Sequence, residues 1–211
     1  RLLDIVASLI CLILTAPISL AVYIAIRLTS PGPGIYKHTR SGYKKDFEFY
    51  KFRTMYTHMS TGKKYGDEQA TTLLNELLEQ KKDSDRSGPL WKIKDDPRIT
   101  PLGKFLRKSK LDEIPQFWNV LIGDMSMIGP RPHMAEQVEK YRQHYGRVFS
   151  IKPGIFGLTQ LAQLSAPNLP FEEEIRLDTY YIENWSLLWD IKIIIKSFYA
   201  LLFTRKPSDI Y

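Results

Sequence analysis

The chain has 211 residues, 44% of them apolar, which is enough for one domain with a buried core. It carries 30 Lys and Arg residues against 23 Asp and Glu residues, and the resulting formal net charge of +7 predicts anionic partners. The single cysteine, Cys11, cannot form an internal disulfide, which excludes the secreted domains that depend on disulfides for stability.

An apolar segment without formal charge occupies residues 5–26. At about 1.5 Å per helical residue, it is long enough to cover the roughly 30 Å hydrocarbon core of a bilayer. A cleavable signal peptide would have a basic leader and a small-residue cleavage site, whereas this segment ends at Arg27-Leu28-Thr29. We therefore predict a retained membrane helix over residues 1–29.

Pro17 lies near the centre of this segment and predicts a kink or a break in the helix. A kinked helix that spans the bilayer and a re-entrant helix that turns at Pro17 and leaves on the side it entered both remain open. Thr15 and Ser19 flank the proline and can satisfy the freed backbone groups in either case. Basic residues at both ends, Arg1 and Arg27, favour the cytoplasmic face for both ends.

The remaining sequence predicts a mainly helical α+β domain over residues 30–211, with one small β-hairpin. A Pro-Gly turn signal at 30–34 precedes the hairpin, which pairs residues 35–38 with the alternating aromatic and polar residues 47–53. Helices are predicted at 68–82, 101–110, 114–121, 134–145, 171–185 and 186–203, with loops at 87–89 and 123–132.

The last predicted helix is strongly apolar but carries Asp190, Lys192 and Lys196. Three charges argue against a helix that crosses the bilayer. The two lysines lie four residues apart, on one helical face, so the segment is either a core helix or one that lies in the membrane interface.

Basic residues cluster at 36–64, with eight Lys or Arg, and at 91–110, with seven. Interleaved aromatic residues would also suit a nucleic-acid surface, but no recognition helix, RNP motif or zinc site accompanies them. A chain with a membrane segment more simply presents such clusters to anionic lipid headgroups. We interpret Lys63, Lys64, Lys81 and Lys82 as ordinary solvated charges.

Two adjacent carboxylates, Asp112 and Glu113, follow the second cluster. Such a pair alone is most often a solvated surface feature. Here, however, Arg107 precedes it by five residues, and Arg131 lies between two prolines in the loop 123–132. Carboxylates beside guanidinium groups suggest a divalent metal and a phosphorylated substrate, because Mg²⁺ binds proteins through one or two carboxylates together with substrate phosphates.

Eight short motifs occur in order along the chain: 51–55 (KFRTM), 95–100 (DDPRIT), 111–116 (LDEIPQ), 119–121 (NVL), 123–126 (GDMS), 129–132 (GPRP), 152–154 (KPG) and 178–181 (DTYY). With them the whole chain resembles the bacterial sugar transferase family, the monotopic polyprenyl-phosphate phosphoglycosyl transferases, and specifically the catalytic domain of larger members. Departures occur at Gly154–Gly157 and Leu164–Asn168, so the resemblance leaves the donor sugar open. Ala16 also stands where the family commonly has a serine before the proline.

The resemblance implies transfer of a sugar 1-phosphate from a UDP-sugar to undecaprenyl phosphate, with release of UMP, as the first membrane step of surface polysaccharide or glycoconjugate synthesis. It implies that Asp112 and Glu113 are the catalytic dyad and hold Mg²⁺, with Asp112 forming a covalent phosphosugar intermediate. Site residues that would bind substrate phosphate are, by the same resemblance, Arg107, Arg131, Lys51, Arg53 and Asp178. Without it, Lys51 and Arg53 would be strand-end surface charges and Asp178 a helix-face ion-pair partner.

The resemblance further implies a re-entrant helix over residues 1–29, amphipathic interfacial helices, and a catalytic domain on the cytoplasmic face of the bacterial inner membrane, in contact with lipid. Homo-oligomerisation is left open. Two other functions compete with the transferase. One is a non-catalytic membrane-surface protein that binds anionic lipid or polysaccharide-assembly partners, and the other, a nucleic-acid binder, does not explain residues 5–26.

Overall fold

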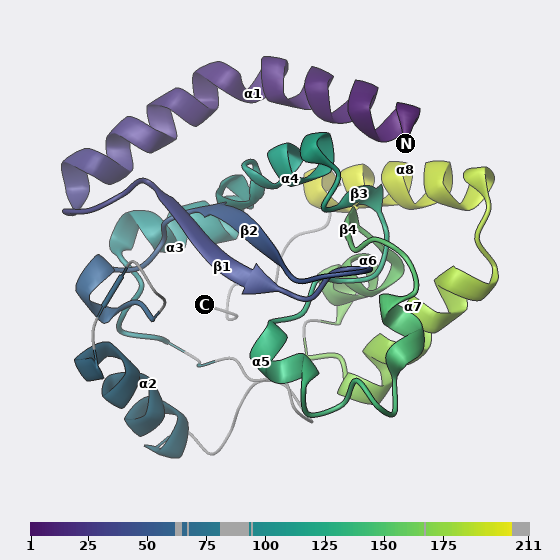
Figure 1. The fold of residues 1–211 in the computed structure, drawn as a ribbon. Helices are drawn as coiled ribbons and strands as arrows, with labels where there is room; N and C mark the ends of the chain where they lie inside the picture. Colours follow the sequence, from purple (N-terminus) through teal and green to yellow (C-terminus); the bar gives the residue numbers. More distant parts are fainter. Residues whose placement is uncertain (62–64, 67, 81–92, 94, 167, 204–211) are drawn as a thin grey trace.

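The computed structural model describes residues 1–211 except 62–64, 67, 81–92, 94, 167 and 204–211. The described chain is mainly helical, with two small sheets (Figure 1). Its α-helices are α1 (Leu2–Thr29), α2 (Glu68–Gln80), α3 (Pro101–Ser109), α4 (Gln116–Ile122), α5 (Ala135–Val138), α6 (Leu158–Ser165), α7 (Phe171–Glu183) and α8 (Leu187–Phe203). Its strands are β1 (Ile35–Arg40), β2 (Phe47–Phe52), β3 (Ser126–Ile128) and β4 (Gly154–Phe156), and 3₁₀ turns are η1 (Thr57–Met59), η2 (Leu111–Glu113) and η3 (Gly146–Phe149).

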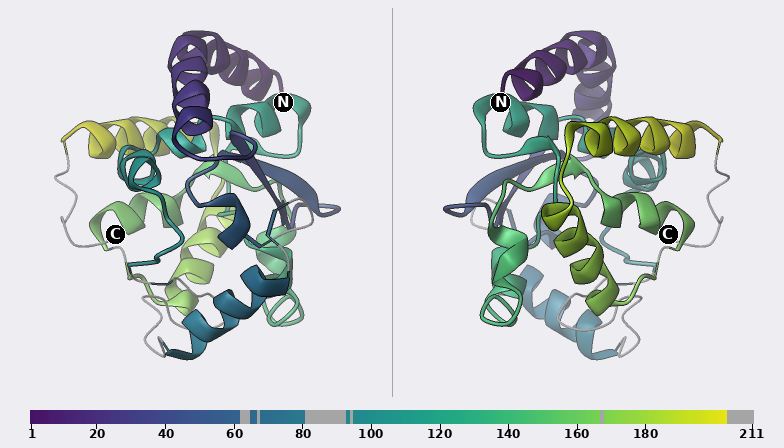
Figure 2. Two further views of the ribbon diagram at one scale, coloured as in Figure 1. Left: turned by 90° about the vertical axis from the view of Figure 1, so that its left-hand side faces the viewer. Right: turned by 90° about the vertical axis from the view of Figure 1, so that its right-hand side faces the viewer.

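Helix α1 is long and curves over the rest of the protein (Figure 1). It continues through Pro17 without interruption, so the break considered from the sequence does not occur. The hydroxyl of Thr15 donates to the carbonyl of Cys11 at 2.6 Å, one turn back. Helices α4 and α8 lie on the same side of the molecule as α1, and α2 and α5 lie on the opposite side (Figure 2).

The predicted hairpin is confirmed: β1 and β2 pair antiparallel, with Tyr36 opposite Lys51. A second sheet, in which β3 and β4 pair in parallel, was not predicted, and the expected loop 123–132 therefore contains a strand. Three-residue strands are too short for alternation to reveal them. A Cβ atom on Gly154 would lie 2.0 Å from the backbone nitrogen of Gly129, so this pairing requires glycine at position 154.

Most predicted helices are present with small differences at their ends. Helices α3, α7 and α8 match 101–110, 171–185 and 186–203, and α4 matches the apolar stretch before Gly123. The prediction for 134–145 was too long, because α5 ends at Val138 and the chain continues in turns that bury Tyr141 against Phe171. Helix α6 was not predicted. Helix α2 covers most of 68–82, whereas the loop at 87–89 and Lys63, Lys64, Lys81 and Lys82 lie outside the described residues.

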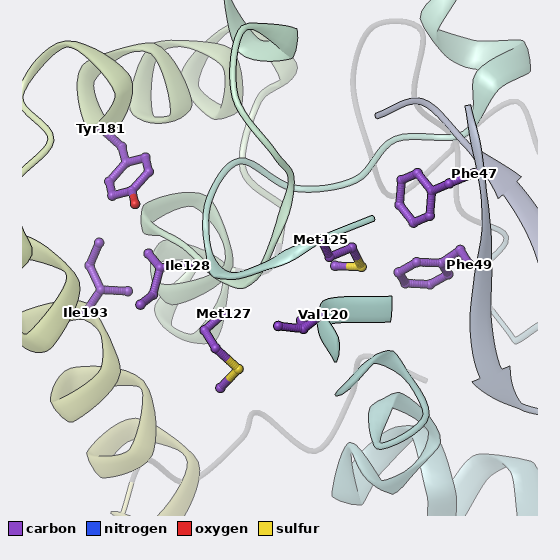
Figure 3. Packing of buried hydrophobic residues seen from close by; sticks show 8 residues of the cluster. All are labelled: Phe47, Phe49, Val120, Met125, Met127, Ile128, Tyr181 and Ile193. Atoms are coloured by element: carbon purple, nitrogen blue, oxygen red, sulfur yellow. The ribbon is translucent and has the colours of Figure 1, made fainter. Parts of the chain in front are cut away.

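The central core lies between the β1–β2 hairpin, α4, β3 and the α7–α8 corner. Figure 3 shows its buried side chains, which are Phe47, Phe49, Val120, Met125, Met127, Ile128, Tyr181 and Ile193. A second cluster joins the last turns of α1 to the site: Val22 and Ile26 pack with Phe52, Leu106 and Ile114. The elements that carry the candidate site are therefore held by both clusters.

Large apolar side chains remain exposed along α1 and α8. Among the described helices, α1 alone is long and apolar enough to cross a membrane, judged by length and composition. In α8, Ile193 and Ser197 face inward, whereas Ile191, Ile195 and Phe198 are exposed beside Lys192 and Lys196; the exposed lysines thus share the outer surface with apolar side chains.

Candidate active site

The dyad lies at a sharp junction between two helices. The hydroxyl of Thr100 accepts a hydrogen bond from the backbone of Gly103 at 2.8 Å and thereby caps the start of α3. At the end of α3, Lys110 adopts a left-handed conformation with φ of 62°, which is unusual for a residue other than glycine. The chain then enters η2, which contains Asp112 and Glu113, and continues into α4.

Lys51 of β2 reaches both carboxylates. Its Nζ atom lies 3.4 Å from Oδ2 of Asp112 and 3.0 Å from Oε1 of Glu113. This proximity depends on the buried side chain of Asn119, which pairs with the edge of β2: its amide accepts from the backbone of Tyr50 at 3.0 Å and donates to the carbonyl of Glu48 at 2.6 Å. Asn119 thus fixes α4, and with it the dyad, against the strand that carries Lys51.

Asp112 is 5% exposed, and its Oδ1 atom has no hydrogen-bond partner among the described residues. An unsatisfied buried carboxylate oxygen is costly, and in native proteins it commonly marks a functional group or a site for an ion. Burial raises the pKa of the neighbouring Glu113, but the positive charges of Lys51, Lys110 and Arg131 outweigh this effect and hold it well below its usual range. The dyad therefore carries negative charge in a partly buried, electropositive setting.

Arg131 lies in the loop that follows β3. A ring of hydrogen bonds joins this loop to α6 and α7. The backbone nitrogen of Arg131 donates to Oδ2 of Asp178 at 3.2 Å, and its Nη1 donates to Oε1 of Gln163 at 3.1 Å. The ring closes through Nε2 of Gln163, which donates to Glu174 at 2.9 Å, and through Thr159, whose hydroxyl donates to Asp178 at 2.7 Å. Burial raises the pKa of Asp178 to about 7, although its two donors lower it.

The structure brings together some of the predicted site residues. Lys51 contacts both members of the dyad, and the charge of Arg131 acts on Glu113. Asp178 lies behind Arg131 and touches its backbone. Arg107, in the last turn of α3, donates from Nε to the hydroxyl of Thr54 at 2.9 Å.

Arg53 is placed differently from the other predicted site residues. It is 2% exposed, and its guanidinium group donates to the carbonyls of Ser30 and Pro33 at 2.9 and 2.7 Å and to the hydroxyl of Thr57 at 2.8 Å. It therefore holds the loop that joins α1 to β1. These three hydrogen bonds occupy its guanidinium group within the protein, and they do not indicate the predicted contact with substrate phosphate.

The residues present fit a magnesium ion that is completed by substrate. No group of three or more His, Cys, Asp or Glu side chains with metal-binding arrangement occurs among the described residues. Two adjacent carboxylates remain, one with a buried oxygen that has no hydrogen-bond partner within the described part of the chain. That donor set matches Mg²⁺, which often uses one or two protein carboxylates and takes its other ligands from substrate phosphates and water.

Four further residues support the site and had not been assigned a role from the sequence: Asn119, Thr159, Gln163 and Glu174. Asn119 lies in one of the eight motifs, so the sequence marks its position. Its hydrogen bonds with β2 are seen only in the structure. Thr159 and Gln163 belong to the unpredicted helix α6, and Glu174 is one of three acidic residues in the first turn of α7. Its complete burial distinguishes it from Glu172, which is exposed.

Comparison with known proteins shows to which family this chain belongs. Residues 1–204 match the family described as "Bacterial sugar transferase". The chain belongs to this family. Its relatives include the galactosyl transferase CpsE of Streptococcus agalactiae serotype III, 39% identical over 204 residues, and the undecaprenyl-phosphate galactose phosphotransferase of Salmonella typhimurium, 37% identical over 207 residues. The exopolysaccharide production protein PSS of Rhizobium leguminosarum bv. phaseoli is 36% identical over 208 residues.

The extent of these alignments differs between relatives. They cover 96%, 93% and 92% of this bacterial sugar transferase chain, respectively. The chain spans 42% of the Streptococcus protein and 39% of the Salmonella protein, but 90% of the Rhizobium protein. The region described here is therefore shared both by long relatives and by one of nearly its own length.

Proposed function

We propose that this protein transfers a sugar 1-phosphate from a UDP-sugar to undecaprenyl phosphate and releases UMP. Family membership and the names of its relatives support the reaction class, which includes galactose and glucose 1-phosphate transfer to undecaprenyl phosphate. The observation that carries the proposal is the buried Asp112, which has one oxygen against Lys51 and the other without a partner among the described residues. A buried carboxylate with an unpartnered oxygen is suited to nucleophilic attack.

In the proposed first step, an oxygen of Asp112 attacks the sugar-proximal phosphorus of the UDP-sugar. The bond from this phosphorus to the oxygen that bridges the two phosphates breaks, UMP leaves with that oxygen, and an acyl phosphate joins Asp112 to the sugar. In the second step, a phosphate oxygen of undecaprenyl phosphate attacks the same phosphorus and the Asp112 carboxylate leaves. The product is undecaprenyl diphosphate sugar.

Positive charge is required because an anionic carboxylate approaches an anionic diphosphate. Lys51 lies against both carboxylates and offsets their charge, and Arg131 presents a planar guanidinium group that suits phosphate oxygens. Magnesium bound by Asp112 and Glu113 would further neutralise the phosphates and polarise the reacting phosphorus. Glu113, held ionised by its basic neighbours, would orient this assembly.

The membrane arrangement in this proposal is a re-entrant α1, which enters and leaves on one side through the curvature of a continuous helix (Figure 1) rather than a break at Pro17, with the catalytic domain on the cytoplasmic face. Both ends of α1 contact the same folded body. In its first turn, Asp4 accepts hydrogen bonds from the hydroxyl of Ser126 and the backbone of Met127, each at 2.9 Å. In its last turns, Val22 and Ile26 pack into the cluster beside the dyad. Such contacts support entry and exit on one side, with α8 in the membrane interface.

The test is UMP release from a panel of UDP-sugars, including UDP-galactose and UDP-glucose, with Mg²⁺ and undecaprenyl phosphate. We expect release with one donor or few, loss of release with Asp112→Asn, and unchanged release with the surface control Glu139→Gln. Without acceptor, one equivalent of UMP per enzyme together with label from the donor sugar on the protein would support the covalent intermediate. A folded wild-type protein that releases no UMP from any donor would favour the non-catalytic membrane-surface protein.

A further inference from the structure

Three polar side chains, two of them completely buried, lie behind Arg131 and take no direct part in the proposed chemistry. Gln163 is partly buried on α6, and Glu174 and Thr159 are completely buried. Burial of polar groups without hydrogen bonds is unfavourable, and a buried carboxylate is especially costly. A cluster of this kind therefore needs a structural or functional reason beyond hydrophobic packing.

The hydrogen bonds fix the orientation of the Gln163 side-chain amide. Gln163 accepts from Nη1 of Arg131 with its oxygen and donates to Glu174 with its nitrogen, so both ends of its amide are fixed. A reversed amide would place its NH₂ group against the guanidinium group, which has only donors. Glu174 thus selects the orientation of Gln163 that accepts from Arg131.

The arrangement leaves most of the guanidinium group available. Gln163 is the one hydrogen-bond partner of the Arg131 side chain among the described residues, and it contacts a single nitrogen. Asp178 meanwhile holds the Arg131 backbone rather than its side chain. The positive charge of Arg131 helps to lower the pKa of Glu113, so the guanidinium group lies within electrostatic range of the dyad.

We propose that Gln163, oriented by Glu174, is a positioning residue that holds the Arg131 guanidinium group for the diphosphate of the nucleotide substrate. This inference rests on the proposed function for the identity of the substrate. A neutral amide suits this role, because it restrains the arginine without neutralising it. A carboxylate in the same place would compete with the substrate for the arginine charge.

The experiment measures the affinity of the purified full chain in detergent for UDP and for uridine. We expect Gln163→Met to weaken UDP binding by about tenfold, because a mobile arginine pays more entropy to bind phosphate. Binding of uridine, which has no phosphate, should be unchanged. Gln160→Met is the matched control: Gln160 lies one turn away on α6, donates to the carbonyl of Gly154 instead, and should tolerate the change.

A double-mutant cycle tests the role of Glu174. Gln163→Glu places a second carboxylate against Glu174 and should weaken UDP binding more than Gln163→Met. The double variant Gln163→Glu/Glu174→Gln exchanges the two side chains. The glutamate at position 163 can then accept from Arg131, and the glutamine at position 174 can donate to that glutamate. The double variant should therefore bind UDP about tenfold more tightly than Gln163→Glu alone. Equal UDP affinity in wild type and Gln163→Met, equal losses for UDP and uridine, or purely additive effects in the cycle would each overturn the inference.

These outcomes separate the inference from the proposed function. Wild-type protein that binds UDP in a Gln163-dependent manner but releases no UMP would contradict the transferase and support the positioning role. Normal UMP release with undiminished UDP affinity in Gln163→Met would support the transferase and contradict the positioning role. Wild-type protein that does not bind UDP would count against both.

Discussion

At the scale of single residues, Lys51 decides the electrostatic state of the dyad. Its ammonium group is the neighbour common to Asp112 and Glu113, at 3.4 and 3.0 Å. Two adjacent carboxylates repel each other, and this cation offsets the repulsion before any substrate or metal arrives. Lys51 therefore has the geometry of a group that would prepare Asp112 as the proposed nucleophile, rather than that of a strand-end surface charge.

Lys51→Met should lower kcat for UMP release by about 100-fold, the size of effect expected when a preorganised charge is removed from a reacting centre. Lys51→Arg should retain more activity than Lys51→Met, because it keeps the charge but changes the contact geometry. Lys44→Met, which removes an exposed lysine from the same hairpin, provides the control. Equal activity of Lys51→Met and Lys44→Met would contradict a role for this cation.

The raised pKa of Asp178 predicts a pH dependence of stability. Between its ordinary value of 3.8 and about 7, the folded protein keeps a proton on Asp178 that the unfolded chain has released. Unfolding therefore releases a proton in this range, and higher pH favours unfolding by up to about 1.4 kcal/mol per pH unit. The stabilising effect of this proton is complete below pH 4 and is lost as pH rises through 7.

Asp178→Asn should remove this dependence, because the amide does not ionise. Thermal unfolding measured from pH 4 to pH 9 should show the Tm of wild type falling relative to that of the variant up to about pH 7, then a constant difference. Parallel Tm curves for the two proteins across pH 4 to 7 would show that Asp178 is ionised in the folded protein throughout.

At the scale of elements, the junction between β2 and α4 places the dyad. Asn119→Leu should lower stability by about 2–4 kcal/mol, since it removes two hydrogen bonds and leaves a strand N–H and a strand carbonyl without partners. It should also lower kcat at temperatures where the protein remains folded, because α4 no longer fixes the dyad beside Lys51. Tm and UMP release would be measured together.

Asn184→Leu is the matched control for this variant. Asn184 also donates to a backbone carbonyl, that of Tyr180 at 2.9 Å, but it is exposed near the end of α7 and far in sequence from the dyad. Water can replace that hydrogen bond, so the change should cost little. A loss of stability in Asn119→Leu no larger than that in Asn184→Leu would contradict the assignment.

The elements also show which features the sequence could predict. The hairpin and helices α3, α7 and α8 were predictable because alternation or helical periodicity extends over six residues or more. Strands β3 and β4 have three residues each, and α5 ends after four, so tertiary contacts decide them. The motifs predict Lys51, Arg131 and the dyad as site residues, and the structure shows that Lys51 contacts both carboxylates, while their roles stay a prediction. Side-chain contacts such as those of Asn119 and Gln163 require the three-dimensional structure.

At the scale of the whole molecule, exposed apolar side chains concentrate on α1 and α8, which lie on one side in Figure 2. Water-soluble proteins rarely expose apolar surfaces of this extent, and in the proposed membrane arrangement lipid would cover them. The dyad joins α3 to α4, and its neighbours Leu106 and Ile114 pack against α1. A soluble nucleotide and a lipid phosphate could therefore meet at the boundary between membrane and water.

The re-entrant arrangement predicts that both ends of α1 face the same side of the membrane. Single cysteines at Leu2, at Leu28 and at Lys45 in the hairpin, each in a Cys11→Ser background, would report on the two ends and the catalytic domain. All three side chains are exposed. In sealed inside-out vesicles a membrane-impermeant thiol reagent should label all three, and in right-side-out vesicles it should label none until detergent is added.

A spanning α1 would instead give opposite labelling of Leu2→Cys and Leu28→Cys. That arrangement would cost contacts that the two ends of α1 make with the folded domain. In a spanning topology, Arg1 could not donate to the carbonyls of Val120 and Leu121, and Asp4 could not accept from Ser126 and Met127 of β3, while Ile26 stays packed beside the dyad. Those hydrogen bonds would be lost, and the two charged side chains would have to find other partners. Labelling of one end only would therefore require the contacts at the other end to be broken in the membrane.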